Sequence, residues 1–253
     1  QEATYSYMIT SFDTDGWSMG NGQTDINYSS RTFCGWCFRA NGGTTVSNSQ
    51  GSITATVQAN QAAGFSIVSY TGGDGSWGSS DTFGHGLSAA PEFMIFKERN
   101  ATDQWTVFHH AVGNGGGSSA AHNNLRLDDN SALYTNQSYK AFAGVMPTST
   151  LVTVDGNTTN LSSSNHIAYI WHGVEGYSKF GSYEGNGNAN GELIDCGFRP
   201  RFLVIKNIDA SDNWVMLDSE REPNNPTGEK VLLWDTTDTE FDPSAVNVDF
   251  LAK

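Results

Sequence analysis

Basic residues are scarce in this chain, and their scarcity excludes two classes of partner. There are 13 Lys and Arg residues against 27 Asp and Glu residues, which gives a net charge of −14. Such a surface repels both phosphate backbones and anionic lipid headgroups. In addition, no apolar run approaches the ~20 residues that a membrane-spanning helix needs. We therefore expect no nucleic-acid partner and no membrane insertion.

Proline and cysteine are also rare. The 6 prolines exclude a collagen or a proline-rich linker as the explanation for the 28 glycines. The 3 cysteines are Cys34, Cys37 and Cys196. The first two have the spacing of a zinc or redox pair, but no second pair of cysteines or histidines completes a metal site. Because both lie in an apolar run, we predict buried free thiols, with no disulfide framework and no zinc.

The chain has no convincing apolar stripe of helical period, which argues against long amphipathic helices. Instead, β-prone runs alternate with turns rich in Gly and Asn. Ile53, Ala55 and Val57 alternate with threonines, as in a half-buried strand. Further strands are expected at 5–12, 65–70, 93–97, 105–109, 167–171, 202–206 and 214–217. The pattern predicts an all-β fold of repeated antiparallel modules, of the sandwich or jelly-roll type, with little helix.

An internal repeat organises the chain. The string PEFMIFK at residues 91–97 matches PRFLVIK at 200–206, and ATDQW at 101–105 matches ASDNW at 210–214. Such self-similarity is the signature of a repeated structural unit. We therefore predict three parts. They are residues 1–63 as the end of a preceding repeat unit plus connecting strands, 64–175 as a complete β module, and 176–253 as a second, incomplete copy.

The repeated tryptophans and lysines have two interpretations each. Trp105 and Trp214 are better explained by packing than by ligand contact, because an indole ring supplies a large apolar area. Lys97 and Lys206 fit equally well an aliphatic cover over the strand or a contact with a ligand.

A fainter echo lies near the N-terminus, where FCGWCF at residues 33–38 parallels HIAYIW at 166–171. The second copy reaches Lys253 without its own version of this strand, and an incomplete sandwich exposes a sheet edge. We hypothesise that residues 33–38, with Trp36 pointing inward, supply the missing strand within the chain or to a neighbouring subunit. If later residues complete the copy instead, 33–38 should pair around 52–70 or 93–97.

No catalytic centre is selected by the sequence. His109 and His110 are adjacent, and adjacent strand residues face opposite ways, so we expect no shared metal. The acidic residues at 128–129 and 235–238 could hold calcium weakly. No Gly-x-Ser-x-Gly elbow occurs, and no carboxylate pair is singled out for glycoside hydrolysis. We predict no catalytic, cofactor-binding or metal-binding residues, and therefore no enzyme.

One longer string resembles a known family. It comprises GYSKFGSY at 176–183, GFRP at 197–200, FLVIK at 202–206 and the Trp at 214, with partial matches at 64–68 and 86–91. It is similar to a domain of unknown function that recurs in tail-fibre-like virion proteins of marine tailed phages. The resemblance covers roughly residues 28–253 and implies a β-rich module on the virion surface, near the tail. Because those relatives continue past Lys253 and Gln1 is not a start methionine, neither end is expected to be natural.

The resemblance implies a structural or adhesion component of the tail or tail fibre, in contact with other virion proteins and with host surface glycans. By analogy with fibres we expect a homo-oligomer, with a trimer as the first guess. Two alternatives stay open. One is a tail-associated depolymerase that cuts surface polysaccharide, and the other is a secreted bacterial adhesin or filament subunit.

Overall fold

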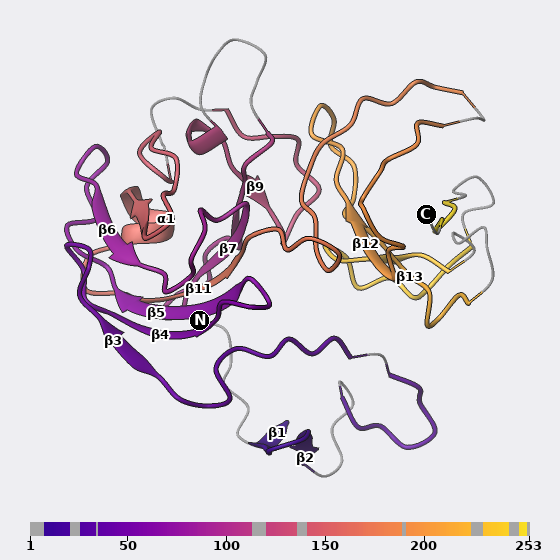
Figure 1. Cartoon of the computed structure of the whole chain (residues 1–253), viewed down its shortest axis with the longest axis horizontal. Coiled ribbons are helices and arrows are strands. Elements are labelled where there is room, and N and C mark those ends of the chain that lie inside the picture. Colours follow the sequence, from indigo (N-terminus) through magenta and orange to yellow (C-terminus); the bar gives the residue numbers. More distant parts are fainter. Residues whose placement is uncertain are drawn as a thin grey trace.

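The computed structural model shows two β-sheet units joined side by side (Figure 1). It describes residues 8–20, 26–33, 35–112, 120–135, 141–188, 191–223, 230–242 and 248–251. Within these ranges, helix is confined to the short helix α1 (Gly156–Asn160) and the 3-10 turn η1 (Ala120–His122). The all-β prediction is therefore confirmed. None of the described helices has the length and apolar character needed to cross a membrane.

A seven-stranded antiparallel sheet forms the first unit. Ala55 and Val57 are buried while Thr56 between them is exposed, which confirms the alternation expected from the sequence. The strand β11 lies in the middle, paired with β5 on one side and β7 on the other. The order is β3 (Val46–Asn48), β4 (Ala55–Asn60), β5 (Phe65–Thr71), β11 (Asn165–Trp171), β7 (Phe93–Glu98), β8 (Thr106–His109) and β9 (Leu125–Arg126).

A second layer covers one face of this sheet. The strands β6 (Asp81–Gly84) and β10 (Leu151–Val154) pair antiparallel and lie over the sheet together with α1 (Figure 1). Phe83 and Val152 of this layer pack with Met94, Phe96 and Ile170 of the sheet. These side chains are almost completely buried, so the sandwich-like core forms in this unit.

The first module begins earlier than the sequence indicated. The expected boundary between residues 63 and 64 falls inside the sheet, because β4 pairs with β5 from Thr56↔Ser69 to Asn60↔Phe65. The strand β3 then pairs with β4. The strands of 1–63 that were assigned to a preceding unit therefore include two strands of this module, whose sheet extends back to Val46.

A three-stranded sheet forms the second unit. It consists of β12 (Phe202–Ile205), β13 (Val215–Asp218) and β14 (Leu232–Leu233). Its own core is small and centres on Leu217, Val231 and Phe250. The main-chain carbonyl of Phe250 accepts a hydrogen bond of 2.9 Å from Nε of Arg199, which ties the end of the described chain to the loop before β12.

The two sheets share the same register in their common hairpin. Phe93 pairs with His109 in the first unit, and Phe202 pairs with Asp218 in the second, at the corresponding positions of the repeat. The third strand follows in both, since β9 pairs with β8 as β14 pairs with β13. The repeat is therefore structural over this three-stranded part, and its hydrogen-bond ladder is the same in both copies.

The resemblance between the copies does not extend to their beginnings. Gly64 leads directly into β5, whereas Gly176 leads into residues 177–188, which contain no strand. Both glycines adopt positive φ, +62° and +75°. Tyr177 and Tyr183 of the second copy are exposed. The prediction that 64–115 and 176–220 share one fold therefore holds for the hairpin and is wrong for the segment before it.

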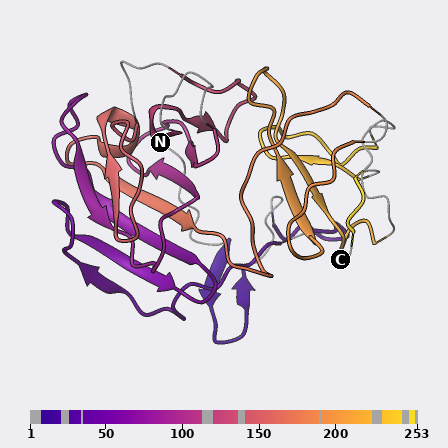
Figure 2. The same ribbon diagram turned by 45° about the horizontal axis from the view of Figure 1, so that its top comes forward.

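The N-terminal part includes the hairpin of β1 (Ile9–Phe12) and β2 (Trp17–Met19). Figure 2 shows the chain after this hairpin crossing from the side of the second sheet to that of the first. The described residues of 33–38 form no strand, and no backbone hydrogen bond joins them to 176–253, 52–70 or 93–97. Pairing within the chain is therefore not observed. Trp36 is 41% exposed rather than inward, although its ring lies 6.0 Å from that of Phe202.

Candidate interaction surfaces

Both repeated tryptophans stand immediately before the second strand of their hairpin and are fixed by the same contact. The backbone N–H of Trp105 donates to Oδ1 of Asp128, and that of Trp214 donates to Oδ1 of Asp235, each at 3.0 Å. These charge-assisted bonds hold the third strand of each sheet against the second. The two carboxylates that were considered for calcium thus have a structural role.

The repeated lysines fasten the loop that precedes each tryptophan. Nζ of Lys97 donates to the carbonyl oxygen of Asp103 and lies 5.8 Å from the centre of the Trp105 ring. Nζ of Lys206 donates to the carbonyl oxygen of Asn207 at 2.6 Å. Burial lowers the pKa of Lys206, and nearby carboxylates oppose the shift. The ammonium groups therefore bind loop carbonyls, a role that neither interpretation of the sequence had named.

In the first copy, this loop borders an open hollow of about 310 Å³. The hollow is lined by Lys97, Thr102, Asp103, Gln104 and Asp128. The neighbouring Trp105 ring is partly exposed. A hydroxyl, an amide and two carboxylates thus lie close to an aromatic ring, which is a suitable set of groups for a polyhydroxylated ligand.

In the second copy, the matching tryptophan packs against the first unit. Nε1 of Trp214 donates to the carbonyl oxygen of Arg126 at 2.8 Å, and the Trp214 side chain is only 3% exposed. Nearby, the backbone N–H of Leu133 donates to the carbonyl oxygen of Ile208 at 2.9 Å. The structure therefore shows one repeated tryptophan in use as a packing contact and the other still partly open.

A shared apolar cluster joins the two units behind these hydrogen bonds. Its buried members are Ile95, Val107, Val112 and Leu125 of the first unit and Trp214 of the second. Partly buried residues of both units surround them: Phe93, Trp105, Leu127, Leu133, Tyr169, Trp171, Val204, Ile208 and Trp234. Burial of this area stabilises the arrangement at about 25 cal/mol per Å² of apolar surface. No pattern in the sequence predicted this interface.

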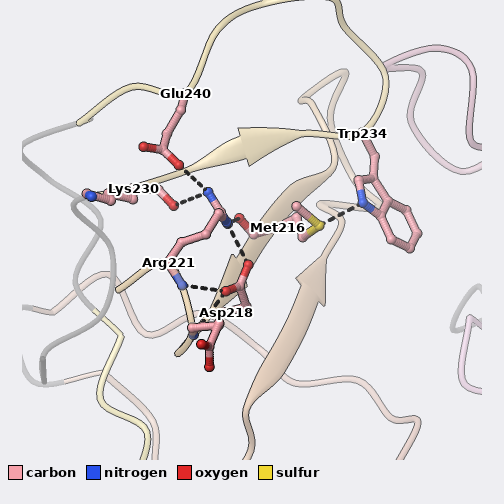
Figure 3. A network of polar contacts seen from close by, with 7 residues as sticks. Met216, Asp218, Arg221, Lys230, Trp234 and Glu240 are labelled. Carbon is pink, nitrogen blue, oxygen red and sulfur yellow. Dashed lines mark hydrogen bonds and ion pairs between the residues drawn. The ribbon is translucent and has the colours of Figure 1, made fainter. Parts of the chain in front are cut away.

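In the second unit, an ionic network lies at the surface that corresponds to the interface surface of the first unit (Figure 3). Arg221 and Glu240 take the repeat positions of Val112 and Leu133, which pack between the units. Nε of Arg221 binds Oδ2 of Asp218 at 2.6 Å, and Nη1 binds Oε2 of Glu240 at 2.8 Å. The arginine and Asp218 side chains are each 8% exposed. Extending the repeat alignment beyond Trp214 would have revealed these two replacements.

The two adjacent histidines do not face opposite ways. The rings of His109 and His110 lie 5.4 Å apart and nearly parallel, because β8 ends at His109 and the alternation of a strand stops there. Nδ1 of His109 accepts the N–H of Ala111 at 3.1 Å, as Oδ1 of Asp218 accepts that of Glu220 at 3.1 Å. The replacement of His109 by Asp218 in the repeat therefore conserves a turn-closing acceptor. Burial, followed by the neighbouring His110, lowers the pKa of His109 to about 4.

The prediction of buried thiols is wrong for Cys37, which is exposed because its segment forms no strand, and Cys196 is intermediate. Cys34 lies outside the described residues. Across the part of the chain that the structure describes, no three His, Cys, Asp or Glu side chains are grouped to hold a metal ion. The expectations of no metal, no cofactor and no catalysis stay predictions.

Comparison with known families matches residues 1–253 to a family described as a domain of unknown function, DUF7483. The chain belongs to this family. No curated protein and no solved structure matches it. Because the match spans both units, the duplicated hairpin lies inside a single family domain.

Proposed function

We propose that this chain is a structural and adhesion component of a phage virion, located in the tail or tail fibre, and that it contacts host surface glycans. The architecture supports a presenting role. Two hairpin modules are fixed to each other by an apolar cluster and by hydrogen bonds between backbone groups and indole. Such a body holds its surface loops in a constant arrangement.

The observation that carries the glycan contact is the open hollow beside Trp105. Glycans are bound by aromatic rings together with polar groups that accept and donate hydrogen bonds to hydroxyls. Thr102, Gln104 and the carboxylates of the hollow supply those groups. Gln104 is the most informative position, because its side chain can be removed without breaking the Asp103 and Asp128 contacts that hold the loop.

Two experiments test the proposal. Antibodies against the purified chain should label the tails of virions whose genome encodes it, and labelling of the capsid alone or of no particle would refute the location. The purified chain should also reduce phage adsorption to host cells in competition. The Gln104→Ala variant should compete less well, while Asn213→Ala, at the matching position of the second copy, should compete as the wild type does. Equal competition by both variants would reject the hollow as the contact site.

The same purified chain can be incubated with host capsule or exopolysaccharide. We expect no release of reducing ends. Release that tracks the chain through purification would instead favour the depolymerase. Absence of the chain from purified virions, together with its presence in the culture medium of a bacterium, would favour the secreted adhesin.

A further inference from the structure

The outer edge of β12 has no partner strand among the described residues. In the first unit, the matching edge of β7 is filled by β11, which pairs along it from Trp171↔Phe93 to His166↔Glu98. In the second unit, the N–H of Ser219 donates to the carbonyl oxygen of Arg201 at 2.9 Å, which fixes the alternation along β12. The backbone groups of Phe202 and Val204 therefore point outward, away from β13.

The side chains of β12 are also less buried than those of β7. All four of its residues are only partly buried, whereas Met94, Ile95 and Phe96 at the matching positions of β7 are buried. β7 is covered by β11, whose Ala168 and Ile170 are fully buried in the same core, as well as by the second layer with Phe83 and Val152. The second unit thus has the edge and the core surface for one more strand.

The chain contains a segment with the pattern of that strand. Residues 33–38 repeat the pattern of β11, with Gly35 at the position of the small, buried Ala168 and Cys37 at the position of Ile170. Phe38 takes the position of Trp171, whose ring lies 5.5 Å from that of Phe93. The described residues of 33–38 are exposed and take no part in any sheet.

Within its own chain this segment is held out of register. The pattern of β11 would place Phe38 beside Phe202, but Trp36 lies there instead. Phe38 is packed against Phe65 and Trp171 of the first unit, with ring centres 5.6 Å and 5.8 Å away. In this chain, the contacts of Phe38 with Phe65 and Trp171 keep the segment from shifting along β12. The same segment of another molecule is not restrained by these contacts.

We propose that residues 33–38 of a second copy of this chain add to the outer edge of β12 as an antiparallel strand. The donated strand pairs Phe38 with Phe202 and Trp36 with Val204, as Trp171 pairs with Phe93 and Tyr169 with Ile95 in the first unit. Main-chain hydrogen bonds along the edge supply affinity, and the strand covers the core with Gly35 and the side chain of Cys37. Because one surface donates and a different one accepts, the contact is heterologous and generates a ring or a filament. This inference does not depend on the virion proposal.

The register makes a specific cross-link available. Cys37 would lie opposite Leu203 in a pair that shares no hydrogen bonds, where Cα atoms are about 4.5 Å apart and a disulfide fits. The full chain carrying Leu203→Cys, with Cys34→Ser and Cys196→Ser, should form covalent multimers on mild oxidation. Peptide mapping should join residues 33–38 to β12. The matched variant with Val204→Cys in place of Leu203→Cys should cross-link several-fold less, because its side chain points to the other face.

Mixing equal amounts of isotopically light and heavy chain before oxidation identifies the donor. Cross-linked peptides that combine one light and one heavy partner support donation between copies. Cross-links that join light only to light and heavy only to heavy show pairing within the chain and overturn the proposal, as does the absence of any cross-link while circular dichroism shows a folded chain.

A second measurement needs no cysteine. Val204→Pro removes an outward N–H from β12 and leaves its hydrogen bonds with β13 intact, as proline on a sheet edge does. Light scattering at micromolar concentration should show the wild type as multimers and this variant as monomers. The donor-side change Trp36→Pro, which removes the N–H that this register directs at the carbonyl of Val204, should have the same effect. Multimers that persist in both variants, or a wild type that is monomeric throughout, would overturn the proposal.

Discussion

The imidazole of His85 should make the first unit sensitive to acid. It is buried, its Nε2 lies 3.2 Å from the carbonyl oxygen of Thr148, and its Nδ1 accepts the N–H of Leu87 at 3.2 Å. Both ring nitrogens are therefore used by the neutral form, with its proton on Nε2. Burial, which outweighs the contact with Thr148, lowers the pKa of His85 to about 4.

The direction in which pH changes the free energy of unfolding follows from proton linkage. The pKa of His85 is lower in the folded state than the value of 6.5 for the free side chain, so the unfolded chain takes up the proton first as the pH falls. The stabilisation is present above about pH 6.5 and is lost progressively down to about pH 4. Between about pH 8 and about pH 5 the loss from this one group is about 2 kcal/mol.

The comparison of two variants isolates this contribution. His85→Asn keeps an acceptor near the position of Nδ1 but does not titrate. The free energies of unfolding of both proteins are measured by urea denaturation. The difference between them should shrink by about 2 kcal/mol from about pH 8 to about pH 5, because only the wild type loses the contribution of His85. Val107→Ala, a buried change in another apolar cluster and without a titrating group, should instead differ from the wild type by the same amount at both values. Parallel curves for wild type and His85→Asn would refute the reasoning.

Two further predictions concern the joint between the units and the network beside it. Arg221→Ala should destabilise the chain by about 3–5 kcal/mol in urea denaturation, since it leaves the buried carboxylate of Asp218 without its cationic partner. Glu240→Gln, at the more exposed end of the network, should cost about 0–1 kcal/mol. Equal losses would contradict the assignment of the buried end. Trp214→Ala should cost about 3–5 kcal/mol and Trp105→Ala clearly less, because the first indole is buried between the units and the second is partly exposed. A larger loss for Trp105→Ala would show that the interface has been misjudged.

The strands and the repeat were predictable because both are read from local patterns. The alternation at Ala55 and Val57 requires only that successive side chains of a strand face opposite sides. The hairpins could be matched because a hairpin joins neighbouring residues, so that equal strings of sequence give equal registers. The loop lengths between the strands differ little in the two copies, which preserves the match through β9 and β14.

Pairing between distant strands was not predictable in the same way. No local property of Val46 or Ala55 indicates that β3 and β4 join the sheet of β5, and the expected boundary therefore fell inside it. The alternation rule also fails where a strand ends, as at His109 and His110. It fails too in the apolar run 33–38, whose described residues form no strand within the chain. Strand propensity describes compatibility with a sheet, and the presence of a free neighbouring edge decides the rest.

The two copies of the hairpin explain which way an assembly of this chain can grow. If the joint between the units simply repeated, the second unit would offer its own apolar surface to the next tryptophan. The positions that should form that surface carry Arg221 and Glu240 instead, and their ion pair is shared with Asp218 (Figure 3). Covering Glu240, whose side chain is 39% exposed, with an apolar side chain would remove its carboxylate from water without a new partner, at a cost that the apolar contact does not offset. The second unit is thus polar where a stacked neighbour would bind, as in the terminal repeats of repeat proteins.

The outer edge of β12 carries no such charges, since its residues are Phe202–Ile205. Growth by strand addition at this edge is therefore compatible with the sequence of the second unit, whereas growth by stacking of further units is not.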